Sequence, residues 1–405
     1  MPRIQSQLDT NSDTFQENRA GMLAKIAELR GFEGRIQARS EQSRERFEKR
    51  GQLLPRDRLD LLLDRGAPWL EFSTLAGYRT YDDDGEDNIT GARLITGIGT
   101  VSGVRCVIIV DDSGITAGAI HTYGVHKMIR AFDMALENKM PVIHLVQSAG
   151  ADLLAYVPET FQKGGGMFHR QAKLSAAGCP VITVVHGSST AGGAYMPGMS
   201  DYVVMVRKQA KAFLAGPPLL RAATGEIADD ETLGGTDMHA STSGLAEHVA
   251  DDDAEAVQVC RDIVRRLNWA NQLRPGLARR HEEPAYDIDE ICGLVSMDYQ
   301  KPYDVRELIA RLVDGSDFLE FKALYDTQTI CGHASVQGFP CGLIGSNGPI
   351  TPEGATKASQ FMQLCSQSDT PLIYLHNTTG FIVGAEPEAQ GMIKHGAKMI
   401  QAVTN

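Results

Sequence analysis

The strongest constraint on the fold is an internal repeat, because segments of the first half of the chain return in the same order in the second half. Residues 317–321 (Asp-Phe-Leu-Glu-Phe) match residues 68–72 (Pro-Trp-Leu-Glu-Phe), and residues 371–375 (Pro-Leu-Ile-Tyr-Leu) match residues 141–145 (Pro-Val-Ile-His-Leu). The separation between matched segments shortens along the chain, as expected for an old duplication with altered loops. The sequence therefore predicts two similar domains, divided by the polar, proline-containing stretch 273–289.

Apolar runs and amphipathic segments alternate along the first repeat. Residues 106–110 and 141–146 are short apolar runs typical of buried strands, and residues 123–138 carry apolar side chains at helical spacing. This order of strand, helix and strand predicts right-handed crossover connections and a largely parallel sheet. The expected fold class is therefore α/β.

We expect three regions along the chain. Residues 1–50 are highly charged and predict a helical arm used for packing or assembly. Residues 51–280 hold the first repeat and residues 281–405 hold the second. Alignment of the repeats places the second counterpart of Gly192 at about position 417, beyond Asn405, so the second domain is expected to be incomplete.

One glycine-rich stretch of the first repeat predicts a strand, a tight turn and the start of a helix. Residues 181–185 are a β-branched run, and Gly187 is expected to end that strand. Residues 188–190 offer hydroxyl side chains for a helix N-cap, followed by Gly192 and Gly193. Unpaired amide N–H groups at such a helix start can bind a developing negative charge on oxygen. The alternative is a turn that only lets a helix pack closely on a sheet.

Composition excludes several classes of function. The chain has 51 acidic and 39 basic residues, so its net charge of −12 argues against nucleic-acid and anionic-membrane partners. Its seven cysteines include no Cys-x-x-Cys pair, which argues against a zinc ribbon and a disulfide framework and favours a reduced, cytoplasmic compartment. We find no secretory signal, membrane-spanning run or metal-ligand cluster, and therefore expect no bound metal.

Four motifs then identify a family. The motifs are residues 53–59 (Leu-Leu-Pro-Arg-Asp-Arg-Leu) with 69–72, residues 147–152 (Gln-Ser-Ala-Gly-Ala-Asp), residues 190–197 with 213–218, and residues 377–381 (Asn-Thr-Thr-Gly-Phe). Together they resemble the carboxyltransferase (β) subunit of biotin-dependent acyl-CoA carboxylases, in the branch that acts on geranyl-CoA or 3-methylcrotonyl-CoA. The resemblance implies two tandem domains of the crotonase-like (ClpP/crotonase) fold, each a ββα repeat, of which the second is incomplete here.

The resemblance also implies a reaction and its partners. Carboxybiotin, carried on a biotin carboxylase and carrier α subunit, would deliver CO2 to the enolate or dienolate of an acyl-CoA. Such enzymes assemble as homo-oligomers built from dimers. Because biotin itself can take the proton in this chemistry, no catalytic histidine or glutamate is expected.

The resemblance assigns roles to three groups of residues. Backbone amides would bind the enolate oxygen, local side chains and a basic cluster would bind acyl-CoA, and a turn in the second repeat would face biotin. The catalytic group is Gly192, Gly193, Ala149 and Gly150; the acyl-CoA group is Ala151, Gly164, Gly165, Ala191, Ala194, Tyr195, Arg207, Lys208 and Lys211; the biotin group is Asn377, Thr378, Thr379, Gly380 and Phe381. The alternative for the basic cluster of Arg207, Lys208 and Lys211 is a group of charges that only contacts solvent.

Gly164 suggests the substrate. It falls where methylcrotonyl-CoA carboxylases have a bulky aromatic residue near the acyl pocket, and replacing a ring by hydrogen makes room for a longer branched chain. Each additional buried CH2 group contributes roughly 0.8 kcal/mol. We therefore expect geranyl-CoA to be favoured over 3-methylcrotonyl-CoA, unless residues 164–166 form only a flexible loop.

Three other interpretations remain open at the level of sequence. His186 beside Ser188 and Ser189 could indicate a hydrolase, although no third orienting group is evident. A crotonase-like hydratase or thioesterase would use the same oxyanion corner without biotin. An inactive assembly module would be consistent with an incomplete second repeat.

Overall fold

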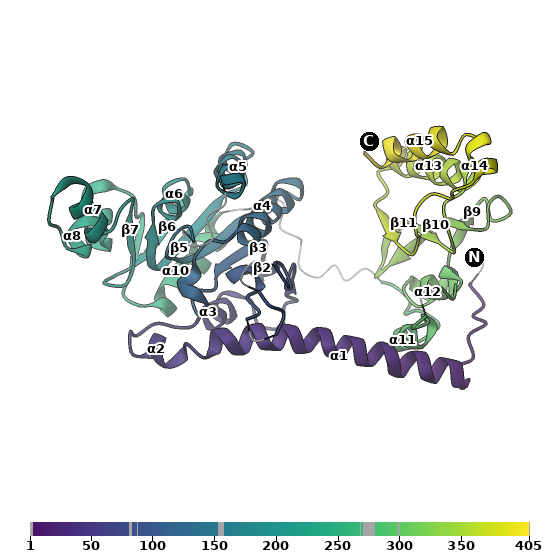
Figure 1. The fold of residues 1–405 in the computed structure, drawn as a ribbon, viewed down its shortest axis with the longest axis horizontal. Coiled ribbons are helices and arrows are strands. Elements are labelled where there is room, and N and C mark those ends of the chain that lie inside the picture. Colours follow the sequence, from purple (N-terminus) through teal and green to yellow (C-terminus); the bar gives the residue numbers. More distant parts are fainter. Residues whose placement is uncertain are drawn as a thin grey trace. The chain divides into compact units, whose positions relative to one another are not determined.

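The computed structural model describes residues 3–80, 83–86, 88–152, 158–267, 269, 280–298 and 300–404. The chain folds into two compact units of mixed α/β structure, one made of residues 29–275 and the other of residues 1–28 and 276–405 (Figure 1). The long helix α1 (Asp13–Glu41) contributes residues to both. The predicted dividing stretch 273–289 lies partly outside the described residues.

The unit of residues 29–275 is built on an eight-stranded sheet with the order β1-β2-β3-β4-β5-β6-β8, in which β7 also pairs with β5. The β1–β2 and β2–β3 pairs are antiparallel, and the remaining pairs are parallel. This confirms the prediction of a largely parallel sheet. Its strands are β1 (Leu70–Glu71), β2 (Leu94–Val101), β3 (Val104–Asp111), β4 (Val142–Ser148), β5 (Val181–Thr190), β6 (Tyr202–Val206), β7 (Lys211–Phe213) and β8 (His248–Ala250).

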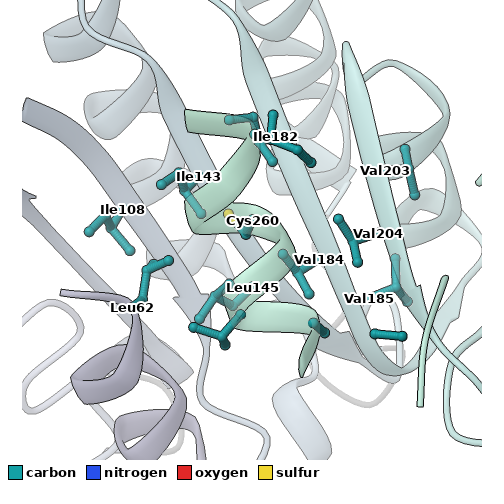
Figure 2. Close-up of a cluster of buried hydrophobic side chains, with 14 of the residues drawn as sticks. Leu62, Ile108, Ile143, Leu145, Ile182, Val184, Val185, Val203, Val204 and Cys260 are labelled. Carbon is teal, nitrogen blue, oxygen red and sulfur yellow. The ribbon is translucent and has the colours of Figure 1, made fainter. Parts of the chain in front are cut away.

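Helices cover both faces of this sheet. The crossover helices α4 and α5 pack on one face through Phe132 and Leu174, whereas α3 and α10 pack on the other through Leu62 and Cys260 (Figure 2). Successive strand residues alternate between these two cores, because side chains on a strand point to opposite faces. The helices are α2 (Arg44–Glu48), α3 (Pro55–Leu62), α4 (Thr122–Glu137), α5 (Pro158–Ala176), α6 (Gly192–Gly198), α7 (Pro217–Thr224), α8 (Asp230–Gly234), α9 (Thr236–Met238) and α10 (Asp253–Arg266).

The other unit has a four-stranded sheet with the order β12-β11-β10-β9. The β9–β10 and β10–β11 pairs are antiparallel and the β11–β12 pair is parallel, with α13 as the crossover helix. Phe361 of α13 is fully buried against this sheet. The elements are β9 (Leu319–Phe321), β10 (Thr329–Val336), β11 (Phe339–Ser346), β12 (Leu372–Leu375), α11 (Ile291–Leu294), α12 (Val305–Ala310), α13 (Pro352–Gln367), α14 (Ala385–Ala389) and α15 (Met392–Thr404).

Corresponding turns of the two units are fixed by the same kind of contact. The Asp64 carboxylate accepts hydrogen bonds from both amides of the β2–β3 turn, at 2.9 and 2.7 Å. The Asp314 carboxylate accepts from both amides of the β10–β11 turn, at 2.7 Å each. Each aspartate therefore sets the geometry of the antiparallel hairpin that precedes the parallel crossover.

Other global features limit the chemistry that the fold carries. None of the helices in the described ranges combines the length and the apolar character that crossing a bilayer requires. Within the same ranges, no group of three histidine, cysteine, aspartate or glutamate side chains could hold a metal ion. All seven cysteines are free thiols, and only Cys292 is not buried.

Candidate active site

The first candidate corner lies at the carboxyl end of β5. We expected Gly187 to end this strand and residues 188–190 to cap a helix, and both expectations are wrong. The strand continues to Thr190 because residues 188–190 pair in parallel with residues 211–213 of β7. The helix α6 then begins at Gly192, as predicted, with Ala191 as an N-cap residue that makes no side-chain hydrogen bond.

Ala191 gives the corner an unusual backbone. Its φ of 53° and ψ of −121° match the first central residue of a type II′ turn, a position that favours glycine. Such a conformation costs on the order of 1–3 kcal/mol in a residue with a side chain. The Ala191 amide donates to Phe213 O at 3.0 Å, which anchors the turn to β7. Within the described residues, the amides of Gly192 and Gly193 donate to no other protein group.

The second corner is the turn of residues 149–151, which follows β4. The Ala149 amide donates to Ala117 O at 3.1 Å, and the Gly150 amide donates to Ser148 Oγ at 3.1 Å. The Ala151 amide has no acceptor within the described chain. The geometry therefore moves the candidate donor from Ala149 and Gly150, which were expected to be catalytic, to Ala151. The physical reason is that the tight turn itself uses the first two amides.

The two corners are direct neighbours in the sheet. Ser148 pairs with Ser189, and a Cβ atom added to Gly150 would lie 2.9 Å from Thr190 O. The amides of Ala151, Gly192 and Gly193 therefore gather at the carboxyl ends of adjacent parallel strands, where ligands usually bind in sheets of this type. Convergent amides without internal acceptors can stabilise an oxyanion.

An apolar wall borders these amides. The rings of Phe168 in α5 and Tyr195 in α6 meet edge to face, with centroids 6.0 Å apart. The Phe168 ring also lies 3.8 Å from the position of a Cβ atom on Gly192. Sequence reasoning missed Phe168, because nothing distinguishes it from other apolar residues of a helix.

Gly164 lies on this same wall, four residues and about one turn before Phe168. The nearest atom to a Cβ built on Gly164 is Met167 Cε, at 4.0 Å, and nothing lies within 4 Å of one built on Gly165. The alternative that residues 164–166 form a flexible loop is wrong, since they lie inside α5. A side chain added at Gly164 would therefore meet little besides the end of the Met167 side chain.

Ala194 and Tyr195 line a further apolar pocket of about 420 Å³. The opposite wall of this pocket comes from β7 and the helices that follow it, through Phe213, Leu220 and Leu233. The two predicted substrate-binding residues of α6 therefore face apolar surroundings. An aliphatic chain is the kind of ligand group that such a surface binds.

The predicted basic cluster is mostly neutralised by carboxylates. Arg207 donates to Asp237 at 3.1 Å and to Asp251 at 2.5 Å. Lys211 is buried, where its ammonium group contacts Glu231 and donates to the backbone oxygen of Lys208 at 3.1 Å. The exposed side chain of Lys208 is then the member best able to meet a ligand phosphate.

The predicted biotin-facing turn repeats the backbone of the 149–151 turn. Gly380, at φ 120°, donates to Thr378 Oγ1 at 3.1 Å, and its oxygen accepts from the Ile350 amide at 3.0 Å. Phe381 forms an isolated parallel bridge with Ile350, as Ala151 does with Ile120 in the first unit. Within the described chain, the Phe381 amide has no acceptor, so it is the counterpart of the free Ala151 amide. Residues 377–379 are exposed.

His186 does not act as the base of a serine hydrolase. Its Nδ1 lies 2.7 Å from Asp253 Oδ1, so a third orienting group exists, far away in the sequence. No hydrogen bond joins His186 to Ser188 or Ser189 within the described residues, and Ser189 Oγ donates to Gly193 O at 2.9 Å. Burial, followed by the positive charge of a nearby arginine, lowers the pKa of His186 to about 4. The ring is therefore neutral and inaccessible at pH 7.

A largely parallel α/β sheet whose strand ends present unpartnered amides beside an apolar wall is suited to an enzyme that stabilises an oxyanion on an acyl group. Residues 46–405 match the family model of the carboxyl transferase domain. The chain therefore belongs to the carboxyl transferase family, and it is the carboxyltransferase component of a biotin-dependent acyl-CoA carboxylase.

Relatives and solved structures agree with this assignment. The chain is 46% identical over 404 residues to the probable biotin-dependent acyl-coenzyme A carboxylase beta2 subunit of Mycobacterium tuberculosis, covering 99% of this chain and 75% of that protein. It is 44% identical over 399 residues to the mitochondrial methylcrotonoyl-CoA carboxylase beta chain of Dictyostelium discoideum, covering 98% and 67%. The crystal structure of the P. aeruginosa geranyl-CoA carboxylase beta subunit is similar with a TM-score of 0.93 and 54% identity, covering 100% of this chain and 75% of that one.

Proposed function

We propose that this carboxyltransferase acts on a branched, unsaturated acyl-CoA and prefers geranyl-CoA to 3-methylcrotonyl-CoA. The observation that carries the preference is Gly164, which leaves open space one helical turn from Phe168 on the wall of the candidate acyl site. The geranyl-CoA carboxylase named above supports the same substrate, whereas the methylcrotonoyl-CoA relative represents the alternative.

The reaction needs a stabilised anion on the acyl thioester. Loss of a proton from the branch methyl group moves charge through the conjugated system to the thioester oxygen. The amides of Ala151, Gly192 and Gly193 bind that oxygen, and each such donor contributes on the order of 100- to 1000-fold in rate. The strained backbone at Ala191 holds two of these amides outward before substrate arrives, so little reorganisation is needed during reaction.

The second unit offers one backbone group that is suited to binding biotin. The free Phe381 amide, in a turn exposed at residues 377–379, is a donor suited to the ureido oxygen. Carboxybiotin on a partner α subunit would supply the CO2 and accept the substrate proton. We assign residues 377–381 to holding this group, and Lys208 to a phosphate of coenzyme A.

The domain organisation is part of the same proposal. Residues 1–50 serve as a helical arm, residues 51–280 as the acyl-CoA domain and residues 281–405 as the biotin domain. The matched aspartate contacts at the two hairpins and the matched turns after β4 and β12 support two tandem crotonase-like domains. Homo-oligomers built from dimers, joined by the biotin-bearing subunit, are the expected assembly, and their mass in solution tests it.

A direct experiment compares two substrates. The protein is combined with a biotin-bearing partner subunit, ATP and labelled bicarbonate, and label fixed into geranyl-CoA and 3-methylcrotonyl-CoA is measured as kcat/KM. A clear preference for geranyl-CoA is expected. Equal or reversed preference would contradict the substrate assignment, and turnover of either acyl-CoA without biotin and ATP would indicate a hydratase or thioesterase.

A further inference from the structure

The turn that carries the free Ala151 amide is held on both sides by buried arginines. Arg58 Nη1 donates to Gln147 Oε1 at 2.7 Å, before the turn, and Arg93 Nη1 donates to Asp152 Oδ2 at 2.8 Å, immediately after it. Arg58 is 1% exposed and Arg93 is 4% exposed. Neither guanidinium group can therefore touch a substrate, and both act on the turn from inside the protein.

On the first side, Arg58 is itself fixed by a buried carboxylate. Asp253 Oδ2 accepts from Arg58 Nε at 3.0 Å and from the Leu53 amide at 2.7 Å. The other oxygen, Asp253 Oδ1, binds His186 of β5 at 2.7 Å. Since Gln147 belongs to β4, this cluster joins the two strands whose ends carry the candidate amides. It therefore fixes their relative position just below the site.

On the second side, Arg93 holds both segments of the bridge that contains Ala151. Its Nη1 also donates to Ala119 O at 3.4 Å, while the neighbouring Ile120 exchanges backbone hydrogen bonds with the 150–152 segment at 2.8 and 3.0 Å. The Arg93 backbone has a φ of 58°, which a side chain rarely adopts, and its oxygen accepts from the Asp112 amide at 3.0 Å. This backbone conformation is the kind that persists only where the surroundings enforce it.

We propose that Arg58 and Arg93 are positioning residues that set the distance from the Ala151 amide to the amides of Gly192 and Gly193. This inference rests on the proposed use of those three amides as the oxyanion site. A planar guanidinium group can bind two acceptors at fixed angles, which an ammonium group cannot do. A displacement of about 1 Å at a catalytic group can reduce a rate on the order of 100-fold.

The test begins with Arg93→Lys, which keeps the charge and removes the fork. We expect kcat with the biotin-bearing partner to fall about 100-fold, while the dissociation constant for acyl-CoA changes less than about threefold. Arg58→Lys should show the same division between kcat and binding. The matched control is Arg261→Lys, because Arg261 pairs with Asp64 at 2.7 Å beside the β2–β3 turn, at the opposite end of the parallel strands. The control should retain wild-type kcat.

A second variant separates positioning from stability. Arg93→Met combined with Asp152→Leu removes both charges together, which spares the fold the cost of one unpaired buried charge. If this double variant unfolds at the wild-type temperature yet remains about 100-fold slow, positioning is supported. Recovery of wild-type kcat in the double variant, or unchanged kcat in folded Arg93→Lys, would overturn the proposal. Rates are measured on whichever acyl-CoA the wild-type enzyme carboxylates, so failure of the geranyl-CoA assignment is scored separately.

Discussion

Gly164→Phe should reverse the substrate preference of the enzyme. A Cβ atom at this position meets nothing nearer than Met167 Cε at 4.0 Å, so the backbone accepts a side chain there. Replacing glycine inside a helix also stabilises α5, by about 0.5 kcal/mol for phenylalanine. The new ring would extend the wall made by Phe168 and occupy the space that we assign to the distal part of a geranyl chain.

The magnitude follows from the apolar surface that the ring displaces. A geranyl group has about five more carbon atoms than a 3-methylcrotonyl group, and burial of each contributes roughly 0.8 kcal/mol. Losing all of that burial costs about 4 kcal/mol, which corresponds to roughly 1000-fold in kcat/KM. Partial rearrangement of the chain reduces the effect, so a loss of at least about 100-fold for geranyl-CoA is expected. The shorter substrate should change by only a few-fold.

The assay measures label from bicarbonate fixed into each acyl-CoA, with the biotin-bearing partner and ATP present at saturation. Gly31→Phe is the matched control: it adds the same ring to an exposed glycine inside a helix, α1, where no atom lies within 4 Å of a built Cβ. This control should keep the wild-type preference. Equal losses on both substrates, or unchanged kcat/KM for geranyl-CoA in Gly164→Phe, would refute the reasoning.

Three further predictions follow from the same geometry. Gly150→Ala forces a side chain onto a residue at φ 87° and within 2.9 Å of Thr190 O, so thermal unfolding should show a loss of about 1–3 kcal/mol and kinetics a lower kcat. The pKa of His186 is about 4 in the folded protein, against 6.5 in the unfolded chain. The free energy of unfolding should therefore fall by up to about 3 kcal/mol as pH drops from 6.5 to 4. In urea titrations, His186→Asn should show a flatter dependence of this free energy on pH. Lys208→Ala should raise the KM for acyl-CoA several-fold with unchanged kcat, whereas Arg207→Ala, whose charge is already paired, should leave both constants unchanged.

Short-range patterns in the sequence were sufficient to predict several strands and helices and one corner of the candidate site. The β-branched run at residues 181–185 predicted a buried strand, and the start of α6 at Gly192 followed from two consecutive glycines. Both features depend on local residue properties: branched side chains favour extended backbone, and glycine allows a tight turn. The match between residues 141–145 and 371–375 likewise located the equivalent strands β4 and β12.

The remaining features depend on partners that are distant in the sequence. Residues 188–190 extend β5 only because β7 supplies a neighbouring strand, which no local pattern at Gly187 reveals. The Ala149 amide is not a free donor because Ala117, in another loop, accepts its hydrogen bond. Asp253 orients His186 across the core, although 67 residues separate them. In each case the deciding contact is formed by tertiary packing, so single-sequence reasoning could name the residue types but not their partners.

The repeat explains why the turn after β4 and the turn after β12 share a backbone conformation and differ in their side chains. Arg56 binds Glu71 through two hydrogen bonds of 3.0 Å, and Arg306 binds Glu320 in the same manner at 2.8 and 2.7 Å. Such paired contacts preserve the path of the chain into each sheet, and with it a free amide at the equivalent turn.

At those equivalent turns, one unit has Ala151 and the other has Phe381, which is 38% exposed. Under the proposed roles, the small residue would leave its amide accessible to a thioester beside the Phe168 wall. The aromatic residue instead supplies an apolar surface beside its amide, suited to a flat, ring-shaped group. Under the proposed roles, a shared anion-binding backbone with different flanking side chains would allow one duplicated fold to receive both an acyl-CoA and a ureido ring. Replacing Phe381 with alanine should weaken use of carboxybiotin without changing acyl-CoA affinity, and a change in acyl-CoA affinity instead would contradict this division of roles.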